Sequence, residues 1–343
     1  NGRVEWGADG LSVSGEASAR ATDTAPLFVA LGLPSTVSPG GVLVADAKIG
    51  TEEGVIRIDP IDGRLGEAKI AGDLRLEGSN LTGNIEMGET SLSDVLAATF
   101  LSWSGGPPKL DRVFADGLPF GLTGEVWIKP ALLRVHRNFA VSDVQIGVVA
   151  NPGEIRLEVF GKARDGRDAR IAIGSRRNGD SRSIDARVML PVDLEKQLLL
   201  AGGAAVASGE GSIDLRFKGE GRSAGGVLAG MKGNGTYSFQ DVRLRDISPA
   251  AFTRKLAEAN DKGGLDAAMA GLLRGESLAA GDISGSIEIA GGIAQFQPFD
   301  IKTPEADATV KTVAEIGQGL IDTAVTLHLK ARPNLPPVEI SYA

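Results

Sequence analysis

The chain has 343 residues, 42% of them hydrophobic, and carries a formal net charge of −8 with no cysteine. The hydrophobic fraction excludes a disordered chain, and the acidic balance argues against nucleic acid as a partner. The absence of cysteine excludes disulfides, thiolate metal sites and cysteine nucleophiles. Glycine, at 47 residues, is about twice as frequent as its ordinary share of ~7%, which indicates many turns and strand ends.

The first module predicted from the pattern spans residues 1–104. Its strands at Val55–Asp59 and Ala68–Glu77 alternate between apolar and charged side chains, which point to opposite faces of a strand. Asp62-Gly63 between them is typical of a tight hairpin turn. Ser91 and Asp94 form a capping-box pattern, which predicts a short helix near residues 91–102.

The second predicted module spans residues 105–203 and continues the same pattern. Alternation predicts strands at Glu154–Val159, Ala169–Ile173 and Ile184–Leu190. Asp165-Gly166 and Asn178-Gly179 lie between these strands and favour hairpin turns. A meander of strands, each hydrogen-bonded to the next, follows from this order.

The third predicted module spans residues 204–343 and adds two helices. Ser248, as N-cap, and Pro249, in the first turn, begin a helix near residues 248–260, and a second helix is predicted near residues 265–274. Each helix is too short to be stable alone, so each is expected to pack on the sheet. The alternating strands of this module are Gly211–Gly219, Gly285–Ile289 and Thr323–Leu329.

These elements predict a mainly β fold, a long antiparallel meander of amphipathic strands with about three short helices. Parallel strands are buried on both faces, so strands with one apolar and one charged face favour antiparallel pairing. Regular alternation of strands with helices is absent, which argues against doubly wound folds and α/β barrels. We expect the sheet to be curled or to form a groove.

The sequence carries no recognisable catalytic or metal-binding constellation. His136 and His328 lack partners at metal-ligand spacing, and neither a nucleophile elbow nor a phosphate-binding loop is present. Arg176, Arg177 and Arg182 flank a turn and are interpreted as a solvated hairpin tip rather than a phosphate site. We therefore predict a protein that is not an enzyme, with no catalytic residue, no metal and no cofactor.

No apolar run reaches the ~18–20 residues that span a bilayer, and the sequence opens on a strand-like stretch at Val4–Trp6. We expect an upstream anchor or leader to be missing from this chain.

In the succession of Gly211–Ser223, Val227–Phe239 and Val242–Ile247, the chain resembles the AsmA family of bacterial envelope proteins, relatives of the TamB-type bridge-like proteins. The resemblance is strongest in the last third, in strand, Gly-rich link and short-helix order. The stretches that carry it are Gly211–Ser223, Val227–Phe239, Val242–Ile247, Gly281–Ser286, Ile293–Phe299, Gly319–Val325 and Leu335–Ser341, with Gly54–Gly72 upstream.

The resemblance implies a periplasmic protein tethered to the inner membrane of a Gram-negative bacterium. Its expected cargo is phospholipid or another acyl-chain lipid, and its expected protein partners are outer-membrane or other envelope proteins. An apolar sheet face would hold acyl chains through buried area alone, at roughly 25 cal/mol per Å². The candidate lipid-facing residues are Ile56, Ile58, Leu74, Leu76, Ile213, Leu215, Phe217, Val325, Leu327 and Leu329.

Other interpretations stay open from the sequence. The same apolar residues could form an ordinary sandwich core rather than a groove. The chain could be a β-sheet scaffold or adhesin-like module that binds protein through a sheet edge. A carbohydrate-active enzyme on a β-helix is a third alternative, because carboxylate pairs can assemble across strands.

Overall fold

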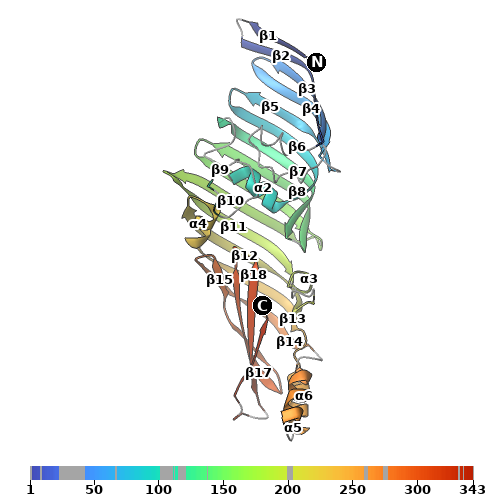
Figure 1. The fold of residues 1–343 in the computed structure, drawn as a ribbon, viewed down its shortest axis with the longest axis vertical. Helices are drawn as coiled ribbons and strands as arrows, with labels where there is room; N and C mark the ends of the chain where they lie inside the picture. Colours follow the sequence, from blue (N-terminus) through green and yellow to red (C-terminus); the bar gives the residue numbers. More distant parts are fainter. Residues whose placement is uncertain are drawn as a thin grey trace. The chain divides into compact units, whose positions relative to one another are not determined.

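The structure is a computed structural model, shown in Figure 1. It describes residues 2–7, 10–22, 43–65, 68–100, 111, 113–114, 121–136, 138–198, 204–258, 262–272, 277–330, 333–334 and 336–342. The predicted module boundaries near 104 and 203 lie outside these ranges, as do the predicted helix ends at 101–102, 259–260 and 273–274.

Strands account for most of the described residues. The strands are β1 (Gly2–Gly7), β2 (Gly10–Ala21), β3 (Leu43–Glu52), β4 (Val55–Leu65), β5 (Ala68–Glu77), β6 (Asn80–Ser91), β7 (Thr123–His136), β8 (Phe139–Asn151), β9 (Glu154–Ala163), β10 (Asp168–Asn178), β11 (Ser181–Asp193), β12 (Ala207–Gly221), β13 (Lys232–Leu244), β14 (Leu278–Ala290), β15 (Ile293–Phe296), β16 (Phe299–Lys302), β17 (Ala306–Glu315), β18 (Leu320–Leu329) and β19 (Val338–Tyr342).

Short helices interrupt the strands. They are α2 (Leu92–Phe100), α3 (Leu194–Gln197), α4 (Ala224–Ala229), α5 (Pro249–Glu258) and α6 (Lys262–Leu272). The predicted helices correspond to α2, α5 and α6, whereas α3 and α4 are additional. Helices α3 and α4 have four and six residues, too few for a helical period to be recognisable in the sequence.

The mainly β fold is confirmed, with an open and mainly antiparallel sheet. One strand pair differs from the expected pattern: β6 and β7 run parallel, in register from Asn80 opposite Thr123 to Ser91 opposite Arg134. A hairpin cannot join parallel strands, because the chain must cross back to the starting end of the sheet. Here α2 and the residues up to Thr123 supply that connection.

The chain divides into two compact units. Unit 1 comprises residues 1–187 and 218–230, and unit 2 comprises residues 188–217 and 231–343. Strands β11 and β12 each contribute residues to both units, so the units interleave along the sequence.

In unit 1, β1 to β10 pair successively along the sequence. Asn178-Gly179 forms the predicted β10–β11 turn, with Gly179 at a φ of +60°. Asp62-Gly63, in contrast, is not a turn but lies inside β4, where Gly63 stands opposite Ala45 and Ile70. A Cβ at Gly63 would lie 2.5 Å from the Val44 carbonyl oxygen, so close approach of β3 explains this glycine.

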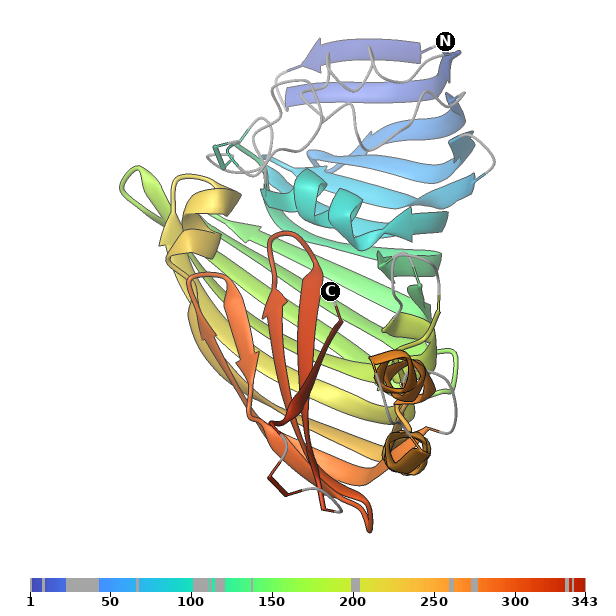
Figure 2. The same cartoon turned by 60° about the horizontal axis from the view of Figure 1, so that its bottom comes forward.

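Helix α2 begins with the predicted cap and packs against β6, β7 and β9 (Figures 1 and 2). The Asp94 backbone N–H donates to Ser91 Oγ at 3.1 Å, and Ser91 Oγ donates to Asp94 Oδ2 at 2.6 Å. Val95, Thr99 and Phe100 are buried. The helix therefore covers part of the sheet of unit 1.

Unit 2 contains a closed hydrophobic core. Strands β13 to β15 and β17 to β19 pair as antiparallel neighbours, and α5 and α6 pack against each other (Figure 2). Ser248 caps α5 as predicted, because its Oγ accepts from the Ala251 backbone N–H at 3.3 Å. Phe252 of α5 and Leu272 of α6 join the core that lies between the helices and strands β13 to β19.

Candidate functional site

Cross-strand rows of apolar residues run over one face of the sheet in unit 1. Residues opposite each other in the register of neighbouring strands share a face. We call the face formed by these rows the apolar face of unit 1. One row is Ile49, Ile58, Leu74, Gly83, Val126, Val148, Leu157 and Ile173, and the next is Ala47, Ile61, Gly72, Ile85, Ile128, Ile146, Val159 and Ile171.

Burial changes along these rows. Ile146, Leu157, Val159 and Ile171, on β8 to β10, are almost fully buried. The described apolar side chains of β3 to β6 are half-buried, and none of them belongs to the buried core. The apolar face is therefore mostly covered at β8–β10, where Val148 and Ile173 stay half-buried, and is partly accessible throughout β3–β6.

Four predicted lipid-facing residues come together on the accessible part. Ile58 stands opposite Leu74, and Ile56 stands opposite Leu76, so the four side chains form a block on β4 and β5. All four are half-buried. Arg57 and Arg75 stand opposite each other on the same two strands and are exposed.

Three further predicted residues lie on β12, in unit 2. Ile213, Leu215 and Phe217 are half-buried. A Cβ on Gly235 of β13 would lie 2.6 Å from Leu215 Cδ2, and a Cβ on Gly233 would lie 2.7 Å from Phe217 Cβ. Glycine at these two positions therefore leaves room for the apolar side chains of β12.

The last three predicted residues occupy the closed core of unit 2. Val325 and Leu327 are 0% exposed and Leu329 is also buried, in contact with a cluster that includes Phe252 and Leu272. The sandwich-core interpretation, left open by the sequence, describes these three side chains. The structure does not bring them together with Ile56, Ile58, Leu74 and Leu76.

Sequence reasoning missed half-buried members of the rows at Ile49, Ile85 and Ile128. Leu81, Ile85 and Met87 do alternate with polar residues along β6. Glycine at position 83 interrupts the apolar side of that pattern, so the strand does not stand out in the sequence.

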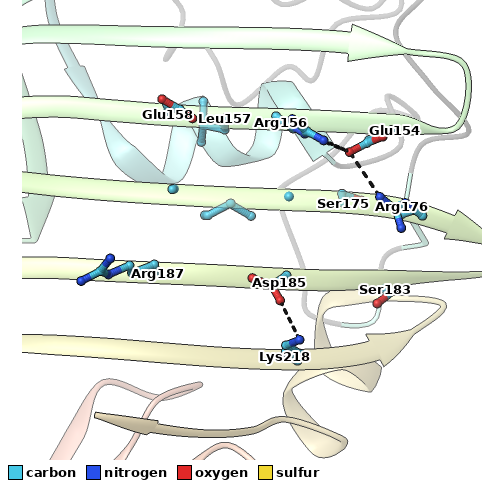
Figure 3. Close-up of a pocket in the computed structure, with 13 residues that line it drawn as sticks. Glu154, Arg156, Leu157, Glu158, Ser175, Arg176, Ser183, Asp185, Arg187 and Lys218 are labelled. Carbon is cyan, nitrogen blue, oxygen red and sulfur yellow. Dashed lines mark hydrogen bonds and ion pairs between the residues drawn. The ribbon is translucent and has the colours of Figure 1, made fainter. Parts of the chain in front are cut away.

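The opposite face of β9 to β12 in unit 1 carries charges around an open cavity of about 480 Å³ (Figure 3). Glu154 pairs with Arg156 at 2.8 Å and with Arg176 at 3.7 Å, and Asp185 pairs with Lys218 at 3.3 Å. The hydrogen bond from Arg156 lowers the pKa of Glu154. Four basic and three acidic side chains line this cavity, so its charges largely balance and it forms a solvated, salt-bridged surface.

The structure adds no catalytic constellation to the apolar face. His136 and His328 are both exposed, as expected from the sequence. Within the described ranges, no group of three or more His, Asp or Glu side chains is arranged to hold a metal ion.

The arginine cluster differs in part from the solvated hairpin tip predicted for it. Arg176 is exposed and ion-paired, whereas Arg182 is only 4% exposed and donates to Ser175 Oγ at 3.1 Å. Arg182 lies on the inner side of β11 with Ile184 and Ala186, because residues two apart on a strand share a face.

A further exposed apolar group lies at the tip of the β17–β18 hairpin in unit 2. Val313, Leu320 and Ile321 are exposed, Leu320 to 54%. Ile293 of β15 is exposed beside them, opposite Glu315. Val313, Leu320 and Ile293 lie on one face of these strands, whereas Ile321 points to the other. Exposed large apolar side chains that share a face are typical of a contact surface.

Comparison with protein-family models, with curated proteins and with solved structures finds no significant match to this chain. In the part of the chain that the structure covers, no helix combines the length and the apolar character needed to cross a bilayer. The resemblance to the AsmA family therefore stays a hypothesis, and the candidate site is the apolar face of unit 1.

Proposed function

We propose that this chain is a non-enzymatic envelope protein that holds phospholipid acyl chains on the apolar face of unit 1. The observation that carries the proposal is the half-buried block of Ile56, Ile58, Leu74 and Leu76. These side chains lie in continuous cross-strand rows with no interleaved charge. A side chain that stays partly exposed in the free protein gains free energy when a lipid covers it.

The charged reverse face of the same sheet supports this proposal. Arg57 and Arg75, adjacent in sequence to Ile58 and Leu74, lie on the solvated side. Each strand thus presents water-soluble groups on one side and an apolar strip on the other. A periplasmic location, an inner-membrane tether and transfer of phospholipid between the two membranes complete the proposal and rest on the AsmA-like stretches.

A second candidate function is a β-sheet scaffold that binds an envelope protein. The exposed side chains Ile293, Val313 and Leu320, which share a face at the β17–β18 tip, favour it. The carbohydrate-active alternative depended on a β-helix, and the meander of antiparallel strands does not provide that fold.

Lipid extraction of the purified protein, followed by native mass spectrometry, tests the proposal. The wild-type protein is expected to retain phospholipid. The double variant Ile58→Gln/Leu74→Gln places amides on the apolar face and is expected to retain several-fold less, because polar groups there would be desolvated by acyl chains.

The matched control is Arg57→Gln/Arg75→Gln, which changes the neighbouring residues of the same strands on the opposite face. It is expected to retain phospholipid at the wild-type level. Circular dichroism confirms that both double variants fold. Recovery of wild-type protein without lipid, under detergent-free purification from the bacterial envelope, would refute the proposal.

A further inference from the structure

A small cavity with basic walls lies at the β10–β11 hairpin of unit 1. Its volume is about 230 Å³, and its lining includes Phe114, Arg177, Asp180, Arg182 and Arg222. Three guanidinium groups thus surround a space that holds one carboxylate, and that carboxylate, Asp180, pairs with Arg222 at 3.3 Å. The lining is therefore cationic, in contrast to the balanced charges on the opposite face.

The cavity is a built part of the fold. Arg182 is 4% exposed, and its guanidinium donates to the Oγ of Ser175, itself 1% exposed, at 3.1 Å. The Phe114 backbone N–H donates to the Arg222 carbonyl oxygen at 3.1 Å, which fixes an aromatic residue beside the cavity. Burial of a guanidinium requires polar partners, which makes a chance arrangement on a solvated tip unfavourable.

The cavity lies at the end of the apolar face of unit 1. Ser175 stands opposite Ile155, which stands opposite Ala150, in a row that begins at Ile56 and Leu76. Arg177 is two residues beyond Ser175 on the same strand and therefore shares that face. Ala150, Ile155 and Ser175 are themselves buried, but Ile173, two residues before Ser175 on the same face of β10, is half-buried. The apolar face thus ends in arginine, the polarity pattern of an amphiphile with an anionic head.

We propose that this cavity binds the phosphate group of a phospholipid. The proposal rests on the proposed function, because the acyl chains would extend from the cavity over the half-buried side chains Ile173, Val148 and Val126 of the apolar face of unit 1. Guanidinium groups match phosphate oxygens through paired hydrogen bonds. The volume is below the roughly 300–1,000 Å³ of pockets that enclose drug-sized ligands, so the cavity suits a head group and leaves the chains outside.

The test compares two lipids with identical acyl chains, phosphatidylglycerol and diacylglycerol, added in mixed micelles to the full chain. Arg177→Gln is expected to weaken phosphatidylglycerol binding about tenfold, the loss of one charge-assisted contact, and to leave diacylglycerol binding unchanged. Arg177 is exposed, so this substitution does not disturb a buried contact.

The control is Arg176→Gln, which removes the adjacent arginine on the opposite face, 72% exposed and paired with Glu154. Its binding of both lipids is expected to match that of the wild type. Arg182→Lys keeps the charge but loses the planar guanidinium. It is expected to weaken the binding of phosphatidylglycerol but not that of diacylglycerol, with an unchanged circular dichroism spectrum.

The outcomes separate the two proposals. If the wild type binds neither lipid, the proposed function fails. If both lipids bind and Arg177→Gln affects them equally, the apolar face holds lipid but the phosphate site is wrong. A third arm titrates inorganic phosphate: binding as tight as that of phosphatidylglycerol would assign the cavity to free phosphate instead of a lipid head group.

Discussion

Leucine has two different environments in this protein. Leu327 is fully enclosed in the core of unit 2, whereas Leu74 is half-buried on the apolar face of unit 1. The loss in free energy of unfolding when a side chain is shortened depends on the contacts that the side chain made. The two residues therefore respond differently to the same substitution.

Leu327→Ala is expected to lower the free energy of unfolding by about 2–5 kcal/mol, since it removes transfer energy and leaves a cavity. Leu74→Ala is expected to cost only about 1 kcal/mol, the common size for a partly exposed site. Urea unfolding at 25 °C measures both. Equal losses would mean that Leu74 is enclosed and that no accessible apolar surface exists there.

Gly83 stands where β5 and β6 approach too closely for any side chain. A Cβ there would lie well inside van der Waals distance of the Asp73 carbonyl oxygen, and its φ is +151°. We expect Gly83→Ala to destabilise unit 1 by more than about 2 kcal/mol, through strain and lost strand pairing. Gly50→Ala is the control, since a Cβ at Gly50 meets nothing within 4 Å, and it is expected to be near neutral.

Tyr237 is expected to make the free energy of unfolding of unit 2 decrease at alkaline pH. Its hydroxyl donates to the Gln297 carbonyl oxygen at 2.8 Å, and burial raises its pKa. Because the pKa is higher in the folded state, the stabilisation is complete below the unfolded-state value of ~10 and is lost as pH rises through the folded-state value.

Tyr237→Phe is expected to cost about 1 kcal/mol at neutral pH through the lost hydrogen bond. Above pH ~10 the difference between the two proteins should shrink. Urea unfolding at a series of pH values checks this. A constant difference up to pH ~12 would show that the pKa of Tyr237 is the same in the folded and unfolded states.

At the scale of elements, helix α2 is the piece that covers part of the sheet of unit 1. Its cap, Ser91, satisfies the Asp94 N–H, and Ser91→Ala is expected to cost about 1 kcal/mol. Hydrogen exchange of the α2 amides should accelerate more than that of β9. The control Ser212→Ala, an exposed position on β12, is expected to leave both rates unchanged.

Strands and helices were predictable wherever a local rule sets them. Alternation located β5 and β9 because a strand exposes one face to water, and capping residues located α2 and α5. The parallel pairing of β6 with β7 was not predictable, since it depends on where the chain returns after α2. The turn predicted at Asp62-Gly63 was wrong for a related reason. Glycine there accommodates the neighbouring strand β3, and the local sequence does not reveal which strand lies beside it.

At the scale of the whole molecule, aromatic residues label the two units separately. Of the three tryptophans, Trp6 and Trp127 belong to unit 1 and Trp103 lies outside the described residues, whereas both tyrosines, Tyr237 and Tyr342, belong to unit 2. Fluorescence of Trp6 and Trp127, measured in a Trp103→Phe background, therefore reports unfolding of unit 1.

A ligand that binds only the folded state raises stability by RT ln(1 + [L]/Kd), about 2.7 kcal/mol at a hundredfold excess over Kd. Phospholipid below its critical micelle concentration is thus expected to raise the urea concentration at the midpoint of the tryptophan-detected unfolding transition. The tyrosine signal of unit 2, measured in a Trp-to-Phe background, should not move. A shift of the tyrosine signal alone would transfer the lipid site to unit 2.

The candidate site was predictable as a face and not as an accessible surface. Period-two alternation places Ile58 and Leu327 alike on apolar faces. Whether such a face stays accessible depends on what covers it. The core around Leu327 includes Phe252 and Leu272, which belong to helices distant from Leu327 in the sequence. Arg182 was missed because turn chemistry near Asn178-Gly179 predicts solvent exposure, while the fold buries that guanidinium.

The interleaving of the two units has a consequence for biosynthesis. Unit 1 needs residues 218–230, and these follow a stretch, 188–217, that belongs to unit 2. Chains emerge from the ribosome N-terminus first, so unit 1 stays incomplete until Gly230 has been translated and released from the exit tunnel. A nascent chain arrested earlier than that carries all the apolar rows of β3 to β10 but lacks the last segment with which unit 1 makes its contacts.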